Sequence, residues 1–275
     1  MEYFLGIDIG SRLTKGVLIE GNKIKAQKLC SSGTNYHSTA QRLRQELLAE
    51  ASVSPEEISY TVATGFGAQS ASFGNQQSDE LRCCARGINL IFPQVRTIID
   101  IGSISSRVIR IDEHGRIVNF AISEKCAAGS GYFMEILANV LRVELQDIGP
   151  LSLKADNPVR FSTGCAVFNE SEAICMVSEG FSKENILAGV HKALATKISS
   201  LINRIQLKQS CAVCGGGGLN VGLIKALERE MGIDLLVPEQ PQIITALGAA
   251  LIAQKIAEEE THANTAGEKK FTDIG

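Results

Sequence analysis

Apolar positions along the chain alternate between a period of two, typical of strands, and a period near 3.6, typical of helices. One strand pattern occurs twice: residues 7–20 read IDIGSRLTKGVLIE, and residues 99–112 read IDIGSISSRVIRID. The two segments align without gaps, and each consists of an apolar strand, a Gly-Ser turn and a second, alternating strand. Because each continues through another turn into a third strand, we expect two halves of similar fold that face each other.

Helical patterns follow the strands in both halves. Apolar stripes with helical spacing run through residues 37–51, 79–91, 133–141, 170–180, 183–205 and 243–257. The stripe of 170–180 places Ala173, Ile174 and Val177 inward. Strands that alternate with helices predict an α/β fold. We expect a first lobe at residues 1–94, a second lobe at 95–257 and a polar, disordered tail at 258–275.

The composition is that of a globular protein, and it narrows the functional classes. The 275 residues are 44% hydrophobic and 21% charged, and the net charge of −3 offers no basic surface for nucleic acid or an anionic membrane. We find no amino-terminal signal pattern and no apolar run of about 18 residues, so a cytoplasmic protein is expected. Eight cysteines favour metal or redox chemistry over structural disulfides in such a compartment.

Each repeated strand ends in an aspartate beside a tight glycine turn. Such an aspartate can hold a hydrated Mg²⁺ while the N–H groups of the turn face phosphate oxygens. Asp8 and Asp100 are therefore the candidate catalytic residues, one on each side of a nucleotide whose phosphates and Mg²⁺ lie between the two domains. Lys15 and Arg107, at matching positions, could neutralise phosphate charge or lie in solvent. The backbone contacts to phosphate are expected from Gly10, Ser11, Gly102 and Ser103.

A glycine-rich turn follows another apparent strand in residues 211–220, CAVCGGGGLN. Such a turn allows the flat approach of a nucleotide base and ribose. The residues expected to line this side of the nucleotide are Gly215, Gly216, Gly217 and Asn220.

Four cysteines are interpreted as thiols without a metal. Cys211 and Cys214 form a Cys-x-x-Cys motif, but positions i and i+3 of a strand face opposite sides of the sheet. The chain also has no second such pair at zinc-site spacing. Cys83 and Cys84 are adjacent in a helical pattern, where they make a poor chelating pair, and we interpret them as core or surface thiols.

Two other cysteines stand just before helical patterns, in KCAAGSG at 125–131 and STGCAVF at 162–168. Small residues and glycines, Gly129 among them, let a backbone close around an anion, and the helix that follows directs N–H groups at it. A phosphate fits poorly here, because the thiolates of Cys126 and Cys165 would repel it. The alternative is a pair of inert buried thiols.

The order of these motifs resembles the actin-like ATPase superfamily of sugar kinases, chaperone ATPases and actin. The likeness rests on Asp8-x-Gly10-Ser11 with Lys15, on Asp100-x-Gly102 and on the glycines from Cys214 to Asn220. It implies an actin-like (ribonuclease H-like) α/β fold with two similar lobes. More narrowly, KCAAGSG and CAVFNESE (residues 165–172) are similar to the ATPase family that activates 2-hydroxyacyl-CoA dehydratases and powers benzoyl-CoA reductases. This likeness covers residues 3–255.

The narrower resemblance implies a specific electron-transfer role. Cys126 and Cys165 would ligate one [4Fe–4S] cluster that lies across the two-fold interface with a second ATPase subunit, the same or a homologous chain. A cluster with four thiolates does require a dimer when each chain supplies two. ATP binding and hydrolysis would tilt the cysteine-bearing helices and pass a low-potential electron to a catalytic acyl-CoA reductase or dehydratase component. The implied donor is reduced ferredoxin or flavodoxin.

One loop departs from that family. Dehydratase activators read Gly-Gly-Gln-Asp-x-Lys where this chain reads GSISSR at residues 102–107, without the Gln and the Asp. This segment, with residues 148–158, resembles the delta-type ATP-binding subunit of benzoyl-CoA reductase. The difference leaves open how the attacking water is positioned and whether the chain hydrolyses ATP alone.

Two other functional classes stay open. One is a small-molecule kinase with the same ATPase core and no cluster, for which we find no convincing catalytic aspartate. The other is a non-hydrolysing ATP-binding structural subunit, with which the altered loop is consistent. The sequence names no acyl-CoA substrate and does not distinguish a homodimer from a heterodimer.

Overall fold

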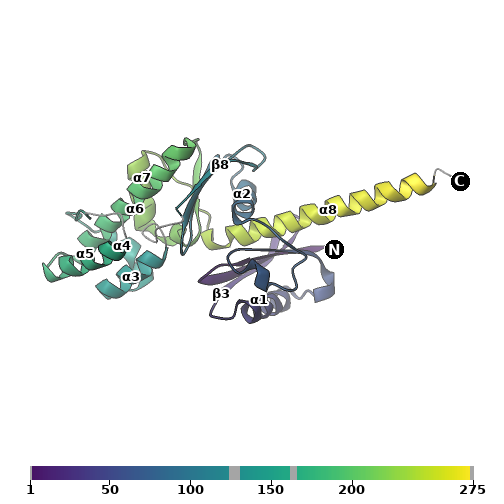
Figure 1. Cartoon of the computed structure of the whole chain (residues 1–275), viewed down its shortest axis with the longest axis horizontal. Coiled ribbons are helices and arrows are strands. Elements are labelled where there is room, and N and C mark those ends of the chain that lie inside the picture. Colours follow the sequence, from purple (N-terminus) through teal and green to yellow (C-terminus); the bar gives the residue numbers. More distant parts are fainter. Residues whose placement is uncertain (1, 124–130, 162–165, 273–275) are drawn as a thin grey trace. The chain divides into compact units, whose positions relative to one another are not determined.

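The computed structural model describes residues 2–123, 131–161 and 166–272. The chain forms two compact units: the first contains Met1–Leu90 and Ile243–Gly275, and the second contains Ile91–Gln242. Each unit is built around its own β-sheet (Figure 1).

The sheet of the first unit begins with the first copy of the repeat. Its strands are β1 (Tyr3–Ile9), β2 (Leu13–Glu20), β3 (Lys23–Ser31), β4 (Ile58–Thr64) and β5 (Gln76–Gln77), in the order β3-β2-β1-β4-β5. Strand β1 is antiparallel to β2 and parallel to β4. Alternate residues of β1 enter opposite cores, because successive side chains of a strand point to opposite faces. Leu5 and Ile7 pack with helix α1 (Tyr36–Ala51), whereas Phe4 packs with helix α8 (Ile244–Thr272).

Helix α8 lies unusually close to its neighbours in the first unit, and its small residues permit this. A Cβ atom added at Gly6 of β1 would overlap the carbonyl oxygen of Ala246. One added at Gly248 would overlap the carbonyl oxygen of Cys83 in helix α2 (Glu80–Ile91). The small residues of the sequence ALGAA at 246–250 make this close packing possible.

The chain divides differently from the expected lobes 1–94 and 95–257. The second unit ends at Gln242, and the chain then returns to the first unit. Residues 258–272, expected to be disordered, continue α8 as helix (Figure 1). The reason is that Leu247, Leu251 and Ile252 anchor α8 in the first core, and each residue added to an existing helix gains a hydrogen bond. Among the described residues, no helix has the length and apolar run that a membrane crossing needs.

The second unit repeats the arrangement of strands. Strands β6 (Thr97–Ile101), β7 (Ser106–Ile111), β8 (Ile117–Ile122) and β9 (Cys211–Cys214) lie in the order β8-β7-β6-β9. As in the first unit, the first strand is antiparallel to the second and parallel to the fourth. The prediction of two halves with similar folds is therefore confirmed.

Helices and strands of the second unit share one core. Phe133, Leu137 and Val190 are completely buried in it, together with Ile99 and Val213 of the sheet. The long helix predicted at 183–205 has those bounds. The helices are α3 (Gly131–Leu141), α4 (Ile148–Ser152), α5 (Ala166–Ser178), α6 (Lys183–Ile205) and α7 (Val221–Met231).

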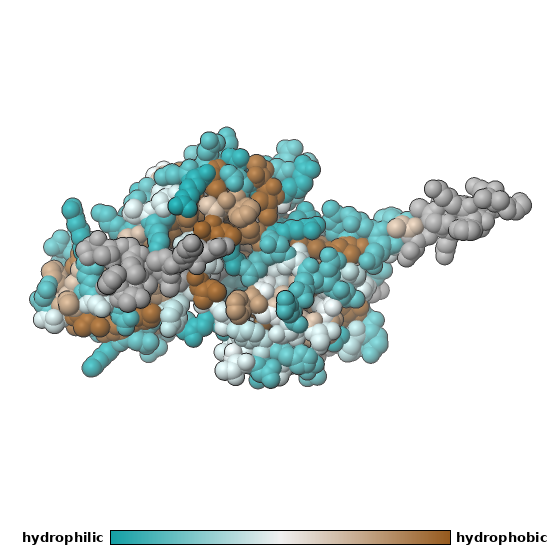
Figure 2. All heavy atoms as spheres, in the orientation of Figure 1, coloured by the Kyte–Doolittle hydropathy of each residue, from teal (hydrophilic) through white to brown (hydrophobic). Residues whose placement is uncertain are grey.

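Helix α5 differs from its prediction at two positions. Ala173 is buried as expected, but Ile174 and Val177 are 52% and 45% exposed. Helix α5 packs against α3 and α6, and this contact covers Ala173 but leaves much of Ile174 and Val177 uncovered. Figure 2 shows hydrophobic residues, in brown, on the surface of this α3–α5 part of the second unit.

Candidate functional site

The first aspartate turn is a hairpin with its own counter-charge. Asp8 lies opposite Lys15 in the β1–β2 pair, and the turn is closed by a hydrogen bond from Gly10 N to Leu13 O, 3.0 Å. Asp8 is 6% exposed, and Lys15 Nζ donates to its Oδ2 at 2.8 Å. The β-hairpin register thus places an ammonium group on a buried carboxylate, which offsets the cost of burying that charge.

The second aspartate turn has the same geometry. Asp100 lies opposite Arg107 in the β6–β7 pair, and Gly102 N donates to Ser105 O at 3.0 Å. Asp100 is buried, and Arg107 Nη1 lies 3.2 Å from its Oδ2. Neither cation points only to solvent, so the solvated alternative for Arg107 is wrong. Whether Lys15 and Arg107 also neutralise phosphate stays a prediction.

Each aspartate is closely approached by a glycine that follows the neighbouring parallel strand. Gly65 has φ +93° and Gly215 has φ +77°, which side chains other than glycine rarely adopt. A Cβ at Gly65 would overlap Oδ1 of Asp8, and one at Gly215 would lie 2.5 Å from Oδ1 of Asp100. The expected turn at Gly215 is confirmed. The sequence TVATGFG at 61–67 likewise predicts a strand that runs into a glycine turn, as observed. The closeness of the two glycines to the aspartates was not predicted from the sequence.

Asn220 is engaged inside the protein. Its Oδ1 accepts from Leu223 N at 3.0 Å and so caps helix α7, while its Nδ2 donates to Nε2 of His191 at 2.9 Å. Nδ1 of His191 lies 2.9 Å from Ser152 Oγ, which itself donates to Gly149 O at 2.7 Å. This pattern assigns the proton of the neutral ring to Nδ1. A contact of Asn220 with a nucleoside stays a prediction.

Burial keeps His191 neutral. The ring is 1% exposed, and desolvation lowers its pKa to about 4. A second proton would sit on Nε2 and face the amide hydrogens of Asn220, so the network also opposes protonation. No motif pointed to this histidine, because the three residues that meet here are far apart in the sequence.

The second turn contains a buried hydroxyl group, that of Ser103. Its Oγ is buried and has no hydrogen-bond partner among the described residues. A buried hydroxyl without a partner costs free energy, and a phosphate oxygen is one group that could satisfy it.

The carbonyl groups of this turn are occupied. Gly131 N and Tyr132 N, at the start of α3, donate to Gly102 O and Ser103 O, both at 2.9 Å. These two N–H groups of α3 therefore bind the turn and are unavailable to an anion at the helix start.

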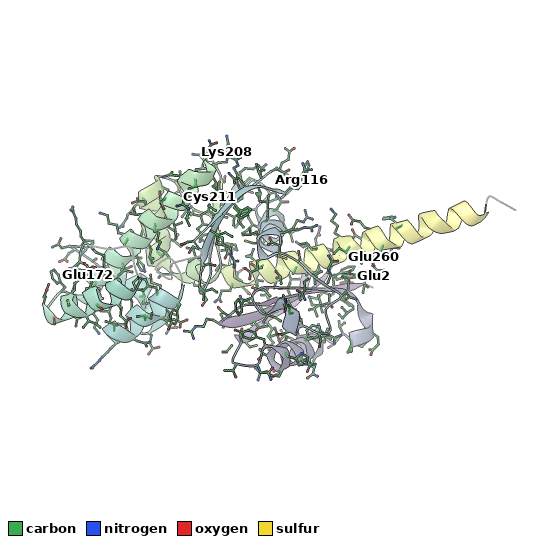
Figure 3. The ribbon with its side chains drawn as sticks, viewed as in Figure 1. Glu2, Arg116, Glu172, Lys208, Cys211 and Glu260 are labelled. Atoms are coloured by element: carbon green, nitrogen blue, oxygen red, sulfur yellow. The ribbon has the colours of Figure 1, made fainter. Side chains whose placement is uncertain are left out.

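The cysteines divide into two groups. Cys126 and Cys165, and also Gly129, lie outside the described residues. Cys211 and Cys214 are buried on β9 (Cys211 is labelled in Figure 3), and Cys83 and Cys84 are buried in α2. Burial raises the pKa of Cys83 to about 11 and that of Cys211 to about 12. Such thiols are poor ligands and nucleophiles, since both roles require the thiolate. The described residues contain no group of three or more potential metal ligands.

The chain matches known proteins over nearly its whole length. The model of the BadF/BadG/BcrA/BcrD ATPase family matches residues 5–253. The chain is 40% identical over 258 residues to the 2-hydroxyisocaproyl-CoA dehydratase activator of Clostridioides difficile, a match that covers 94% of this chain and 97% of that protein. It is 33% identical over 257 residues to a benzoyl-CoA reductase subunit of Thauera aromatica, covering 90% and 91%.

A solved structure agrees with these relatives. The activator of the 2-hydroxyisocaproyl-CoA dehydratase from Clostridium difficile with bound ADPNP has a TM-score of 0.90 at 39% sequence identity, covering 95% of this chain and 97% of that one. The expected actin-like ATPase fold is confirmed. Over its whole length the chain is more similar to the dehydratase activator, at 40% identity, than to the Thauera aromatica protein, at 33%. The likeness of residues 102–107 and 148–158 to a delta-type reductase subunit stays a prediction. The chain belongs to the BadF/BadG/BcrA/BcrD ATPase family.

Proposed function

We propose that this chain is an ATP-hydrolysing electron-transfer component, an activase, of an acyl-CoA dehydratase or reductase system. The observation that carries the proposal is the pair of matching aspartate turns, each with a buried carboxylate, a basic partner and a closely approaching glycine. Family membership supports the ATPase activity, and the relatives named as a dehydratase activator and a reductase subunit support the class of partner.

Asp8 and Asp100 would organise Mg²⁺-ATP. Carboxylates suit a Mg²⁺ that keeps most of its waters, and the turns offer N–H groups to phosphate oxygens. Lys15 Nζ lies beside the turn, since a Cβ at Gly10 would be 3.2 Å from it. An ammonium group has three donors, so Lys15 can serve Asp8 and a phosphate together. Gly215, Gly216, Gly217 and Asn220 would line the nucleoside side.

Cys126 and Cys165 would hold a [4Fe–4S] cluster jointly with the same residues of a second chain. The support is the resemblance of their motifs. Cys83 and Cys211, in contrast, are buried thiols with a raised pKa and are poor ligands. A cluster of this type supplies one-electron transfer at low potential. Reduced ferredoxin or flavodoxin would be the donor, and the dehydratase or reductase component would be the acceptor.

Anaerobic purification with iron, sulfide and EPR analysis tests the cluster. We expect about four irons and four sulfides per dimer. Cys126→Ser and Cys165→Ser should each lose the cluster. Cys175→Ser is the matched control, because Cys175 is an exposed thiol of α5 and follows Cys165 closely in the sequence. A cluster-free, active monomer would overturn the proposal in favour of a kinase-like protein.

The steady-state rate of ATP hydrolysis tests the role of the two aspartate turns. It is measured for this chain alone and for the chain with a candidate dehydratase or reductase. Gly215→Ala should lower turnover on the order of 100-fold, because the new Cβ displaces Asp100 and small misplacements at a reacting centre are costly. Gly232→Ala is the control: it also has positive φ, +67°, but no atom lies within 4 Å of its added Cβ. Absence of turnover under both conditions, with ATP still bound, would instead assign a non-hydrolysing subunit.

A further inference from the structure

Asn220 joins the glycine turn of the second unit to helix α7. Its backbone N donates to Gly217 O at 3.1 Å, a hydrogen bond that closes the end of the turn. Its backbone O accepts from Ile224 N at 3.0 Å and its Oδ1 accepts from Leu223 N at 3.0 Å, so the same residue begins the helix. The position of Asn220 therefore affects both the turn and the start of α7.

The orientation of the Asn220 amide group is set by His191. Nδ2 of Asn220 donates to Nε2 of His191 at 2.9 Å, and a rotated amide would direct Oδ1, an acceptor, at this acceptor nitrogen. Nδ1 of the ring donates to Ser152 Oγ, which in turn donates to Gly149 O at 2.7 Å. Another neighbour of Nδ2, Sδ of Met134 at 3.9 Å, is a weak acceptor. Hydrogen bonds that all run in one direction thus hold the amide in one orientation.

This chain of hydrogen bonds lies where three helices meet. Ser152 belongs to α4, His191 belongs to α6, and Asn220 is the N-cap of α7. Glycines allow the helices to approach: a Cβ at Gly222 would overlap Ser152 Oγ, and one at Gly149 would lie 2.8 Å from Asn220 Oδ1. The His191 ring is almost completely buried. Water has little access here, so the loss of one partner leaves a buried polar group unsatisfied.

The first unit contains the same type of turn with a different histidine contact. Ser70 takes the place of Asn220 there, and its carbonyl oxygen lies 3.0 Å from Nδ1 of His37, which is exposed. The matching main-chain hydrogen bonds run from Ala68 N to Gly65 O and Ser70 N to Gly67 O in the first unit, and from Gly218 N to Gly215 O and Asn220 N to Gly217 O in the second. The turn is therefore shared by both units, whereas the buried histidine belongs to the unit to which we assign the nucleoside contacts.

We propose that His191 is a positioning residue for nucleoside binding, and that it acts through Asn220 on the glycine turn. The inference rests on the proposed function, in which this turn lines the nucleoside side. While His191 holds Nδ2, Oδ1 stays on α7 and the turn keeps one conformation before a nucleotide binds. Without this acceptor, the amide is either unsatisfied or rotates, and rotation breaks the cap of α7 and releases the turn.

The expected effect of losing His191 is a weaker affinity for nucleotide. The nucleotide then binds only those molecules whose turn has the competent conformation, and the apparent Kd rises as their fraction falls. The loss of a partner from a buried hydrogen-bonding group is costly enough to reduce that fraction to about one tenth. We therefore expect the Kd of the non-hydrolysable ATP analogue ADPNP to rise about tenfold.

Three variants separate hydrogen bonding from packing. His191→Leu removes the acceptor and retains a side chain of similar size. His191→Gln is the conservative variant, because its amide offers an acceptor to Asn220 and a donor to Ser152. His37→Leu is the matched control, since it makes the same substitution at the histidine beside the turn of the first unit.

Calorimetry of the full chain with Mg²⁺ and ADPNP measures the Kd, and urea unfolding of the same samples measures stability. We expect a Kd about tenfold above the wild-type value in His191→Leu, and a Kd close to the wild-type value in His191→Gln and His37→Leu. A merely structural role of His191 predicts a less stable His191→Leu with an unchanged Kd, and this result would overturn the inference. A Kd of His191→Gln as high as that of His191→Leu would overturn it too.

A measurement on the wild type makes the test independent of the folding of a variant. Nitrogen-15 NMR of the histidine ring identifies the nitrogen that carries the proton, and we expect Nδ1 of His191 both with and without ADPNP. A proton on Nε2 would take the acceptor away from Asn220, which would overturn the inference and leave the proposed function standing. If calorimetry detects no binding of ADPNP to the wild type, the proposed function fails and the inference fails with it.

Discussion

At the residue scale, the aspartate turns are notable for how each buried charge is balanced. Asp8 and Asp100 sit at the ends of the central strands, nearly without solvent, and a basic residue from the adjacent strand lies on each. Removing one partner of such a pair is costly because the other charge stays buried. The basic residues therefore stabilise the buried carboxylates of the two turns.

The buried His191 makes stability depend on pH. Its pKa in the folded protein is about 4, below the ordinary value of 6.5, so the unfolded chain takes up the proton first as pH falls. This contribution is intact above about pH 6.5 and is lost progressively toward pH 4. The free energy of unfolding at about pH 5 should be about 2 kcal/mol lower than at about pH 7.5.

Urea unfolding followed across that pH range measures the effect. His191→Gln supplies the control, since a neutral amide does not titrate and offers both a donor and an acceptor to Ser152 and Asn220. The variant can be less stable overall, but its pH dependence should be flatter by the same amount. Identical slopes in the two proteins would show that His191 is not the titrating group.

At the element scale, close packing decides where helix α8 belongs. Gly6 and Gly248 let α8 approach β1 and α2 so closely that a methyl group at either position would overlap a carbonyl oxygen. Gly248→Ala should lower the free energy of unfolding by at least about 2 kcal/mol, despite the gain of about 1 kcal/mol in helix propensity. Thermal and urea unfolding provide the measurement.

A second helical glycine serves as the reference for that change. Gly131→Ala in α3 has room for its Cβ, so there the gain in helix propensity should not be opposed by overlap. If Gly248→Ala and Gly131→Ala have the same free energy of unfolding, the close approach of α8 to α2 does not hold in solution.

At the scale of the whole molecule, the first unit is discontinuous in sequence. Strand β1 opens the chain, yet the helix that covers one face of its sheet comes after the entire second unit. Phe4, Val17 and Val62 are buried against this helix. The first unit therefore cannot complete its core until the carboxyl-terminal helix is present.

Two truncations test this dependence. A chain of residues 1–257 keeps the buried part of α8 and should retain protection of the β1 and β4 amides against hydrogen exchange. A chain of residues 1–242 should lose that protection while the β6 and β9 amides keep theirs, because the second core is unchanged. Protected β1 and β4 amides in the shorter chain would contradict the assignment.

Local patterns in the sequence were sufficient to predict the repeated hairpins and most of the helices, and to identify the family. An aspartate, a glycine turn and a basic residue at fixed spacing specify the same hairpin in both halves, because strand register follows from turn length. The buried face of α6 likewise follows from the helical period of its apolar residues. The close packing of α8 depends on the small size of its side chains. Each of these features depends on residues that are close in the sequence.

Only the tertiary structure decided the features that join distant residues. It placed Gly65 and Gly215 close to the two aspartates. It also placed His191 within hydrogen-bonding distance of Ser152 and Asn220. The start of α3 forms hydrogen bonds with the turn at Gly102 and Ser103. It also returned α8 to the first unit and left Ile174 exposed on α5. The physical reason is the same in each case: the periodicity of a segment states which face is apolar, but only the packed chain determines which other segment meets that face.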